Sequence, residues 1–161
     1  MRNSESKIIT REALAALSTR LHREGRRIVT CNGSFDLLHF GHLTFLEFAR
    51  AQGDVLIVGM NSDASIKQYK SPDRPIVPEE RRARLLAALE AVDYVHIFSE
   101  TVPMPFLDIV KPNIHVNGEE YGYDCIEAPT VLRHGGRIVL VPKVAGLSTT
   151  ELIARIKRMP A

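Results

Sequence analysis

Two histidines, His39 and His42, are spaced three residues apart directly after a glycine-bearing turn. The turn begins at Gly33 and follows the apolar run 28–31, which is typical of a buried strand, and an amphipathic segment up to Ala51 follows the histidines. A strand that leads through a glycine turn into a helix directs free backbone N–H groups and the positive end of the helix dipole at one point. Two imidazoles on the same turn add hydrogen-bond donors there. These residues predict a phosphate-binding site, in which Gly41 allows a ligand to approach closely.

The residues that open the last predicted helix form a second candidate site. Ser148 or Thr149 can act as the N-cap with Glu151 nearby, and ordinary helix capping alone explains these residue types. The alternative is that the hydroxyl and N–H groups from Ser148 to Thr150 bind a phosphate. Gly146, just before them, permits a close approach. Taken together with the histidine turn, these residues favour phosphate binding.

Five basic residues lie in and after a stretch that carries Pro72 and Pro75. A solvated surface would explain them, but cations at the start of the helix predicted from Glu79 are unfavourable against its dipole. A basic loop that closes over a polyphosphate explains this local conflict. We favour a functional role for Lys70 and Arg82 and leave the others open. The five residues are Lys67, Lys70, Arg74, Arg81 and Arg82.

Two adjacent carboxylates, Glu119 and Glu120, lie in a loop that follows a short apolar run. The loop can be an ordinary turn. Alternatively, its carboxylates bind sugar or ribose hydroxyls or assist a magnesium ion. In the glycine turn, Asp36 is better explained as an architectural acceptor of backbone N–H groups, and Phe35 as a core residue.

Short apolar runs alternate with helical patterns along the chain. This alternation predicts an α/β fold, a single doubly wound Rossmann-like domain over residues 1–161 with an N-terminal helical segment at 1–25. Because the apolar residues are consecutive, we expect a mostly parallel five-stranded sheet with helices on both faces. The predicted strands are 28–31, 55–60, 94–98, 114–116 and 138–141, and the predicted helices are 10–24, 42–51, 79–91, 105–110, 125–134 and 149–158.

Ligands of such sheets bind beyond the carboxyl ends of the strands, where the strand order switches. The segments that follow the predicted strands are all polar or contain glycine, whereas the opposite ends look like ordinary turns. We therefore expect the chemistry at one edge of the sheet. The segments are 32–42, 61–63, 98–100, 117–121 and 142–150.

Composition limits the possible classes of protein. With 161 residues, of which 45% are apolar, the chain can bury one core. A net charge of +2 gives no general attraction to nucleic acid, and no apolar run reaches the roughly 18 residues of a membrane span. Cys31 and Cys125, without a signal peptide, predict free thiols and a cytoplasmic protein. The two histidines have no cysteine cluster or HExxH pattern beside them, so we expect no metal bound by the protein itself.

The run from Gly33 to His42 resembles the GxFDxxHxGH signature of the cytidylyltransferase-like nucleotidyltransferases. The branch it resembles most is the adenylyltransferase domain of bacterial ADP-heptose synthase. Further segments follow that branch, and together they cover nearly the whole chain between residues 7 and 157. These segments are 61–65, Lys70, 74–76, Arg82, 89–95 and the terminal 148–150.

The resemblance implies transfer of a nucleoside monophosphate from a nucleoside triphosphate to a phosphorylated alcohol, with release of pyrophosphate and with Mg²⁺ carried by the nucleotide. It implies a catalytic set of His39, His42, Lys70 and Arg82, in which the histidines hold the triphosphate. The implied nucleotide-binding residues are Asn32, Gly33, Ser34, Phe35, Gly41, Asn61, Asp63, Gly118, Lys143, Gly146, Ser148, Thr149 and Thr150. The implied substrate-binding residues are Lys67, Asn117, Glu119, Glu120 and Tyr121.

Two departures from the pattern leave the substrates open. ADP-heptose synthases carry Lys-Gly-Gly-Asp-Tyr where this chain has residues 117–121, and the run 143–150 looks closer to the RTEGISTT run of cytidylyltransferases. Residues 90–93 follow the heptose branch, so we favour ATP and heptose 1-phosphate. The alternatives are a cytidylyltransferase that uses CTP and a polyol or amino-alcohol phosphate, and a nucleotide-binding regulatory module without turnover. We expect a homodimer, as in the family, that binds neither nucleic acid nor membranes.

Overall fold

Five strands form one sheet in the computed structural model, which describes residues 3–142 and 148–160. The strand order is β3-β2-β1-β4-β5, and all four pairings are parallel. Strands β2 and β4 flank β1 and lead the chain in opposite directions, so the order switches at β1. The predicted doubly wound parallel sheet is confirmed. The strands are β1 Ile28–Gly33, β2 Val55–Asn61, β3 Tyr94–Phe98, β4 Ile114–Gly118 and β5 Arg137–Val141.

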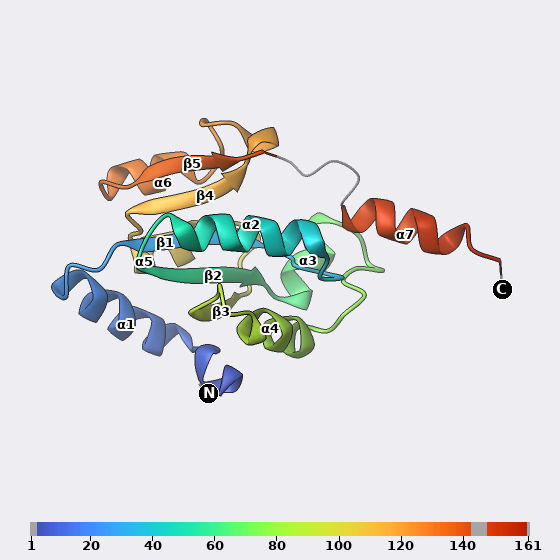
Figure 1. Cartoon of the computed structure of the whole chain (residues 1–161), viewed down its shortest axis with the longest axis horizontal. Coiled ribbons are helices and arrows are strands. Elements are labelled where there is room, and N and C mark those ends of the chain that lie inside the picture. Colours follow the sequence, from blue (N-terminus) through green and yellow to red (C-terminus); the bar gives the residue numbers. More distant parts are fainter. Residues whose placement is uncertain (1–2, 143–147, 161) are drawn as a thin grey trace.

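Helices cover both faces of this sheet, as expected (Figure 1). Buried residues of α2 and α4, such as Leu46 and Leu86, belong to one hydrophobic core, and those of α1, α5 and α6, such as Leu14 and Phe106, belong to the other. The helices are α1 Arg11–Arg23, α2 Phe40–Ala51, α3 Asp63–Tyr69, α4 Glu79–Ala88, α5 Met104–Val110, α6 Ala128–Arg133 and α7 Thr149–Lys157, with short 3-10 turns η1 Ser4–Lys7 and η2 Glu119–Tyr121.

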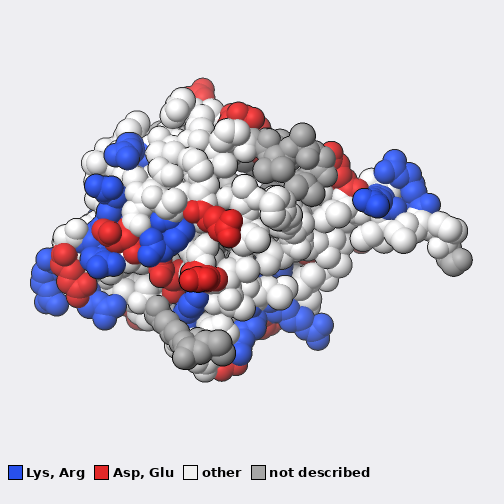
Figure 2. Space-filling view, in the orientation of Figure 1, with Lys and Arg blue, Asp and Glu red and all other residues white. Residues whose placement is uncertain are grey.

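The carboxyl ends of the strands lie at the end of the molecule where α7 begins (Figure 1). At the opposite end, in the same orientation, lysine and arginine side chains are interspersed with aspartate and glutamate (Figure 2). The face in view therefore carries mixed charges there rather than a broad basic surface. Of the helices in the described ranges, none is both long and apolar enough to span a membrane. Cys31 and Cys125 are free thiols, as predicted.

Three helices differ from the prediction. Helix α3 was not predicted because its polar start was interpreted only as a strand-end turn, yet Ser62 caps it by accepting a hydrogen bond from Ser65 N. Helix α6 begins at Ala128 rather than Cys125, consistent with Pro129 in its first turn, where a missing N–H costs nothing. Helix α4 ends at Ala88, three residues before the predicted end.

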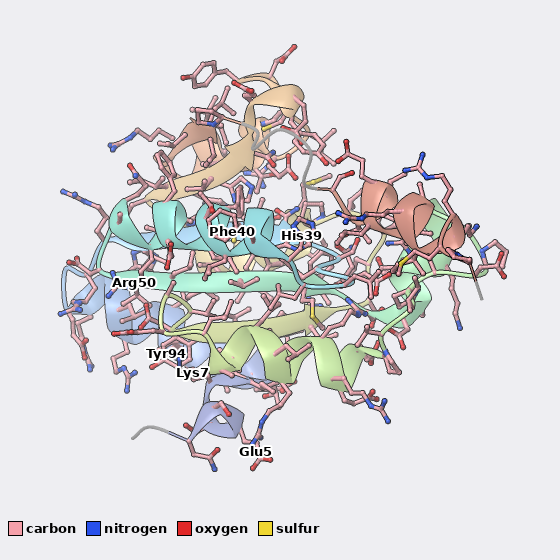
Figure 3. The ribbon with its side chains drawn as sticks, turned by 45° about the vertical axis from the view of Figure 1, so that its right-hand side comes forward. Glu5, Lys7, His39, Phe40, Arg50 and Tyr94 are labelled. Carbon is pink, nitrogen blue, oxygen red and sulfur yellow. The ribbon has the colours of Figure 1, made fainter. Side chains whose placement is uncertain are left out.

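A long-range contact accompanies the early end of α4. The Nζ atom of Lys7 donates hydrogen bonds to the carbonyl oxygens of Leu89 and Val92, at 3.1 and 2.7 Å. These carbonyls follow α4 and are satisfied by a side chain more than 80 residues away. Lys7 lies near Tyr94, at the start of β3, in Figure 3, and Ile8 forms a parallel bridge with Val95 of that strand. The N-terminal segment thus packs along the edge strand β3.

Candidate functional site

The two histidines form one unit at the start of α2. His39 is the N-cap, and its Nδ1 atom accepts a hydrogen bond from Gly41 N at 3.1 Å, while His39 N donates to Nδ1 of His42 at 3.4 Å. The two rings stack with centroids 3.9 Å apart. Figure 3 shows His39 at one end of α2 and Arg50 at the other. Because backbone N–H groups occupy both Nδ1 atoms, each neutral ring carries its proton on Nε2 and can donate it to a ligand.

Burial keeps both imidazoles neutral. Removal from water, together with the nearby His39 and Lys70, lowers the pKa of His42 to about 4, while Asp36 acts in the opposite direction. Burial also lowers the pKa of His39. At neutral pH the pair therefore presents N–H donors without a full positive charge. A bound polyanion would raise both pKa values.

Asp36 ties the glycine turn to the basic segment that follows α3. Its carboxylate accepts hydrogen bonds from Arg74 Nε at 2.8 Å and from the backbone N–H groups of Ile76 and Val77 at 2.9 and 3.0 Å. Burial alone would raise the pKa of Asp36, but these three donors outweigh it and lower the pKa. The architectural role predicted for Asp36 is confirmed.

The residues on either side of Asp36 adopt an unusual backbone. Phe35 and Leu37 have φ angles of 47° and 50°, in the left-handed region that side chains other than glycine rarely adopt. Phe35 is buried, as predicted, and its ring lies 5.4 Å from that of His42 between centroids. Backbone strain of this kind is maintained only where surrounding contacts hold it, and it is frequent at binding sites.

The start of α7 reaches the same turn. Ser148 Oγ accepts a hydrogen bond from Glu151 N at 3.1 Å and donates one to the Glu151 carboxylate, so the capping interpretation holds. In addition, Thr149 Oγ1 donates to the backbone carbonyl oxygen of Asp36 at 2.8 Å. The terminal helix start therefore lies against the histidine turn, although more than 100 residues separate them in sequence.

Two adjoining pockets open at this edge of the sheet. The first, which we call the histidine pocket, has a volume of about 320 Å³, and His39 lines it together with Ser148 and Thr150. The second, which we call the strand-end pocket, has a volume of about 440 Å³ and extends over the ends of the strands to Phe98 and Thr101. Both pockets share the lining residues His42, Phe45, Lys70, Gly118, Glu120, Tyr121 and Thr149.

Most of the predicted site residues meet at these pockets. Lys70 lines both, and burial is the main cause of its lowered pKa. Lys143 and Gly146 lie outside the described residues. The predicted residues that line one or both pockets are Asn32, Gly33, Ser34, Phe35, His39, Gly41, His42, Asn61, Lys70, Asn117, Gly118, Glu120, Tyr121, Ser148, Thr149 and Thr150.

Arg82 does not lie at the pocket surface, where its predicted role in closing over the phosphates would place it. Its side chain is only 1% exposed and lines neither pocket. Instead its guanidinium donates to the carbonyl oxygens of Val77, Ser34 and Asn61, and to the carboxylate of Asp63 at 2.6 Å. Arg82 therefore supports the loops beneath the pockets, because protein acceptors occupy four of its five N–H donors.

Three other predicted residues also lie outside the pocket walls. Asp63 is engaged by Arg82, Lys67 is exposed on α3, and Glu119 is exposed in η2. Conversely, the prediction missed Tyr69, Thr101 and Glu127 as lining residues. Tyr69 lies within hydrogen-bond distance of Ser34 Oγ at 2.6 Å. No local sequence pattern marks these three, because only the tertiary fold brings them to the pocket.

The donor set around the histidine pocket suits an anion. Imidazole N–H groups, the Lys70 ammonium and the start of α7 surround it. Among the residues that the structure describes, no three histidine, cysteine, aspartate or glutamate side chains come together as a metal site.

Known proteins are similar to this chain in sequence. Residues 30–155 match the family described as Cytidylyltransferase-like. Bifunctional protein HldE of Trichlorobacter lovleyi is 43% identical over 161 residues, which cover 96% of this chain and 32% of that protein. HldE of Nitratiruptor sp. is 47% identical over 146 residues, covering 91% of this chain and 31% of its own. The chain spans about a third of the length of these curated relatives.

Two solved structures resemble the fold. The lipopolysaccharide core biosynthesis protein from Thermoplasma volcanium has a TM-score of 0.60 and is 28% identical, covering 74% of this chain and 98% of its own. Pantoate-beta-alanine ligase from Francisella tularensis has a TM-score of 0.59, and the match covers 95% of this chain and 79% of that one. At 16% identity the second likeness concerns the fold alone.

Proposed function

The chain belongs to the cytidylyltransferase-like family of nucleotidyltransferases, and from this membership we propose that it transfers the adenylyl group of ATP to a sugar phosphate, with heptose 1-phosphate as the favoured acceptor. The products are an ADP-sugar and pyrophosphate. The resemblance to the adenylyltransferase domain of ADP-heptose synthase and the similarity to HldE proteins over nearly the whole chain support this choice. The similarity to the lipopolysaccharide core biosynthesis protein from Thermoplasma volcanium supports a sugar substrate.

One observation carries the proposal. The stacked imidazoles of His39 and His42, the Lys70 ammonium and the start of α7 line the same pocket. A triphosphate is a linear chain of anionic groups, and donors on several sides of one pocket fit such a chain better than a single phosphate. The adjoining strand-end pocket leaves room of about 440 Å³ for a second substrate beside it.

The protein needs to supply little covalent chemistry for this reaction. A phosphate oxygen of the acceptor attacks the α-phosphorus in line, a P–O bond to it forms, and the bond to the pyrophosphate oxygen breaks, so that the electron pair leaves with pyrophosphate. No general base is needed, because a phosphate monoester is already largely ionised near neutral pH. Positioning of the two substrates and stabilisation of charge account for the rate enhancement.

Each part of the site has its own task in this scheme. The Nε2–H groups of His39 and His42 donate to the oxygens around the α-phosphorus, where charge builds up in the transition state. Lys70 and the N–H groups at the start of α7 receive the leaving pyrophosphate. Asp36 and Arg82 act as positioning residues, since their hydrogen bonds hold the surrounding loops.

Mg²⁺ fits this site as a partner of the nucleotide. Asp36, the carboxylate of the histidine turn, is engaged by three donors, and no metal-binding cluster is present among the described residues. The phosphate oxygens of the nucleotide would hold the ion, which would offset negative charge on the triphosphate.

Release of pyrophosphate tests the proposal. Each of ATP, CTP, GTP and UTP is combined with sugar 1-phosphates, polyol phosphates and amino-alcohol phosphates in the presence of Mg²⁺. We expect the highest kcat/KM with ATP and a heptose 1-phosphate. Turnover with CTP and a polyol or amino-alcohol phosphate would instead identify the cytidylyltransferase alternative. If no pair releases pyrophosphate although nucleotide binds, the chain is a nucleotide-binding module without turnover.

A further inference from the structure

Away from the histidines, Glu127 holds two asparagine side chains over the strand ends. Its Oε1 accepts a hydrogen bond from Asn32 Nδ2 and its Oε2 accepts one from Asn117 Nδ2, each at 3.2 Å. Asn32 lies near the end of β1 and Asn117 near the end of β4, so the glutamate spans the two strands at which the sheet order switches. All three residues line the strand-end pocket. The transfer chemistry described above uses none of these contacts.

The charge of Glu127 is poorly compensated. The side chain is 5% exposed, and it forms no ion pair with any lysine, arginine or histidine in the described ranges. The nearby His115 is fully buried, and burial lowers its pKa to about 4 although Glu127 acts to raise it, so His115 is neutral. The Cys125 thiol beside Glu127 is a weak donor. Burial of a carboxylate with such partners is costly unless further donors complete its shell.

Glu127 has unused acceptor capacity on the pocket side. A carboxylate offers roughly four lone-pair positions, and the two amides take two of them. The two amides also fix the plane of the carboxylate. Among the charged and apolar side chains that line the same pocket lie four neutral hydroxyl and amide groups, namely Ser34, Asn61, Tyr69 and Thr101. This lining suits a ligand with several hydroxyl groups.

We propose that Glu127 is a specificity-determining residue that accepts hydrogen bonds from sugar hydroxyl groups of a bound substrate. The inference rests on the proposed function, which supplies two sugars at this edge of the sheet, the ribose of the nucleotide and the acceptor sugar. Both offer the same hydroxyl chemistry to Glu127. A substrate that lacks the hydroxyl leaves the buried carboxylate without its donor, and the enzyme discriminates against it for that reason.

Deoxy analogues test this assignment and separate the two sources. In one arm kcat/KM is compared between ATP and its 2′-deoxy and 3′-deoxy analogues; in the other, between the sugar phosphate and its deoxy analogues. We expect the wild type to prefer the hydroxyl compound by about 10- to 100-fold in one arm. In Glu127→Gln, which keeps the side-chain volume, this preference falls to a few-fold, and the arm in which it falls identifies the sugar. A purely structural role would lower kcat/KM for both compounds alike and leave their ratio unchanged.

Asp93→Asn is the matched control. Asp93 is likewise a carboxylate engaged within the protein, by a hydrogen bond from Leu56 N at 2.8 Å and by an ion pair with Arg50, but it precedes β3 at the opposite edge of the sheet. This variant loses stability without losing the preference for the hydroxyl compound. If Glu127→Gln does not fold, Glu127→Asp keeps the charge but withdraws it by one methylene, and a weakened preference is again expected.

If a folded Glu127 variant keeps the full wild-type preference for the hydroxyl compound in both arms of the experiment, the inference is overturned. Failure of the proposed function has a different signature, since the wild type would then release no pyrophosphate with any pair. In that case calorimetric Kd values for ATP, for the sugar phosphate and for their deoxy analogues test Glu127 independently of turnover. Equal Kd values for each compound and its deoxy analogue would again contradict the role.

Discussion

Thr149 donates a hydrogen bond from Oγ1 to the backbone carbonyl oxygen of Asp36, across 2.8 Å. The carboxylate of the same Asp36 accepts from Arg74 and from two backbone N–H groups that follow it. One residue of the glycine turn thus holds the start of α7 on one side and the basic segment on the other. The two candidate phosphate-binding segments are joined before any ligand arrives, which lowers the entropy cost of binding.

Loss of this contact weakens nucleotide binding. In Thr149→Val the hydrogen bond to Asp36 is removed while the side-chain shape is kept, so we expect the KM for the nucleoside triphosphate to rise about 2- to 10-fold, with little change in kcat. Thr149→Ser restores the hydroxyl and should return KM close to that of the wild type. Steady-state kinetics at a saturating concentration of the acceptor measure KM and kcat of each protein. Equal KM values in all three proteins would show that the contact plays no part in binding.

Removal of either imidazole slows turnover. Each provides an Nε2–H donor to the α-phosphorus in the proposed reaction, and loss of such a donor typically costs about 3–4 kcal/mol of transition-state stabilisation. His39→Ala and His42→Ala should therefore each lower kcat at least roughly 100-fold, while circular dichroism shows an intact fold. His134, which pairs with Asp108 at 2.8 Å away from the pockets, supplies the control His134→Ala with unchanged kcat. Near-wild-type turnover in either test variant would refute the assignment.

Acidification below neutral pH destabilises the protein through His42. Its pKa is about 4 in the folded protein and about 6.5 in an unfolded chain, so the folded state binds fewer protons between these values. Stability is therefore complete above about pH 6.5 and is lost as the pH falls toward 4. The unfolding free energy of both proteins is measured with urea at pH 7 and at pH 5. Between these pH values the wild type should lose about 2 kcal/mol more than His42→Asn. The fully buried His115 has a similarly low pKa, and it contributes to the acid destabilisation of both proteins alike. Parallel losses in both proteins would contradict the buried, neutral state of His42.

Arg82 is a stability residue in this structure. Its replacement by methionine leaves the carbonyl oxygens of Ser34 and Asn61 and the Asp63 carboxylate without their donor. Loss of one partner of a buried charged network typically costs about 3–5 kcal/mol. Arg81 is exposed on the same helix, so Arg81→Met should change the unfolding free energy by less than about 0.5 kcal/mol. Denaturant unfolding of the two variants compares them directly, and similar stabilities would indicate that Arg82 is not engaged as described.

The sequence alone was sufficient to predict the sheet, because strands of a parallel sheet are buried on both faces and leave consecutive apolar residues. The run 55–61 is buried throughout and was predicted within one residue. The histidine turn was equally visible, since glycine, imidazole and helix start follow one another in sequence. Its neighbours in space could be inferred only because parallel strands bring all their carboxyl ends to one edge.

The errors share a physical cause. Whether a charged side chain faces a ligand or the protein depends on acceptors supplied by distant loops, and Arg82 finds its acceptors in three other segments. The carbonyl groups that follow α4 likewise find their donor in Lys7, which precedes them by more than 80 residues. The sequence did not indicate Glu127 as a pocket residue, because a lone glutamate is typically solvated. Only the fold buries it against two strand-end amides.

The most direct test of the central claim follows the site residues as a triphosphate binds. The imidazole Nε2 signals of His39 and His42 and the backbone amide signal of Thr150 are recorded by NMR while a non-hydrolysable ATP analogue with Mg²⁺ is titrated in. The account predicts that all three signals shift along one binding curve with a single Kd, because one phosphate chain contacts both imidazoles and the start of α7. Imidazole signals that stay unchanged while Thr150 responds, or two different Kd values, would contradict it.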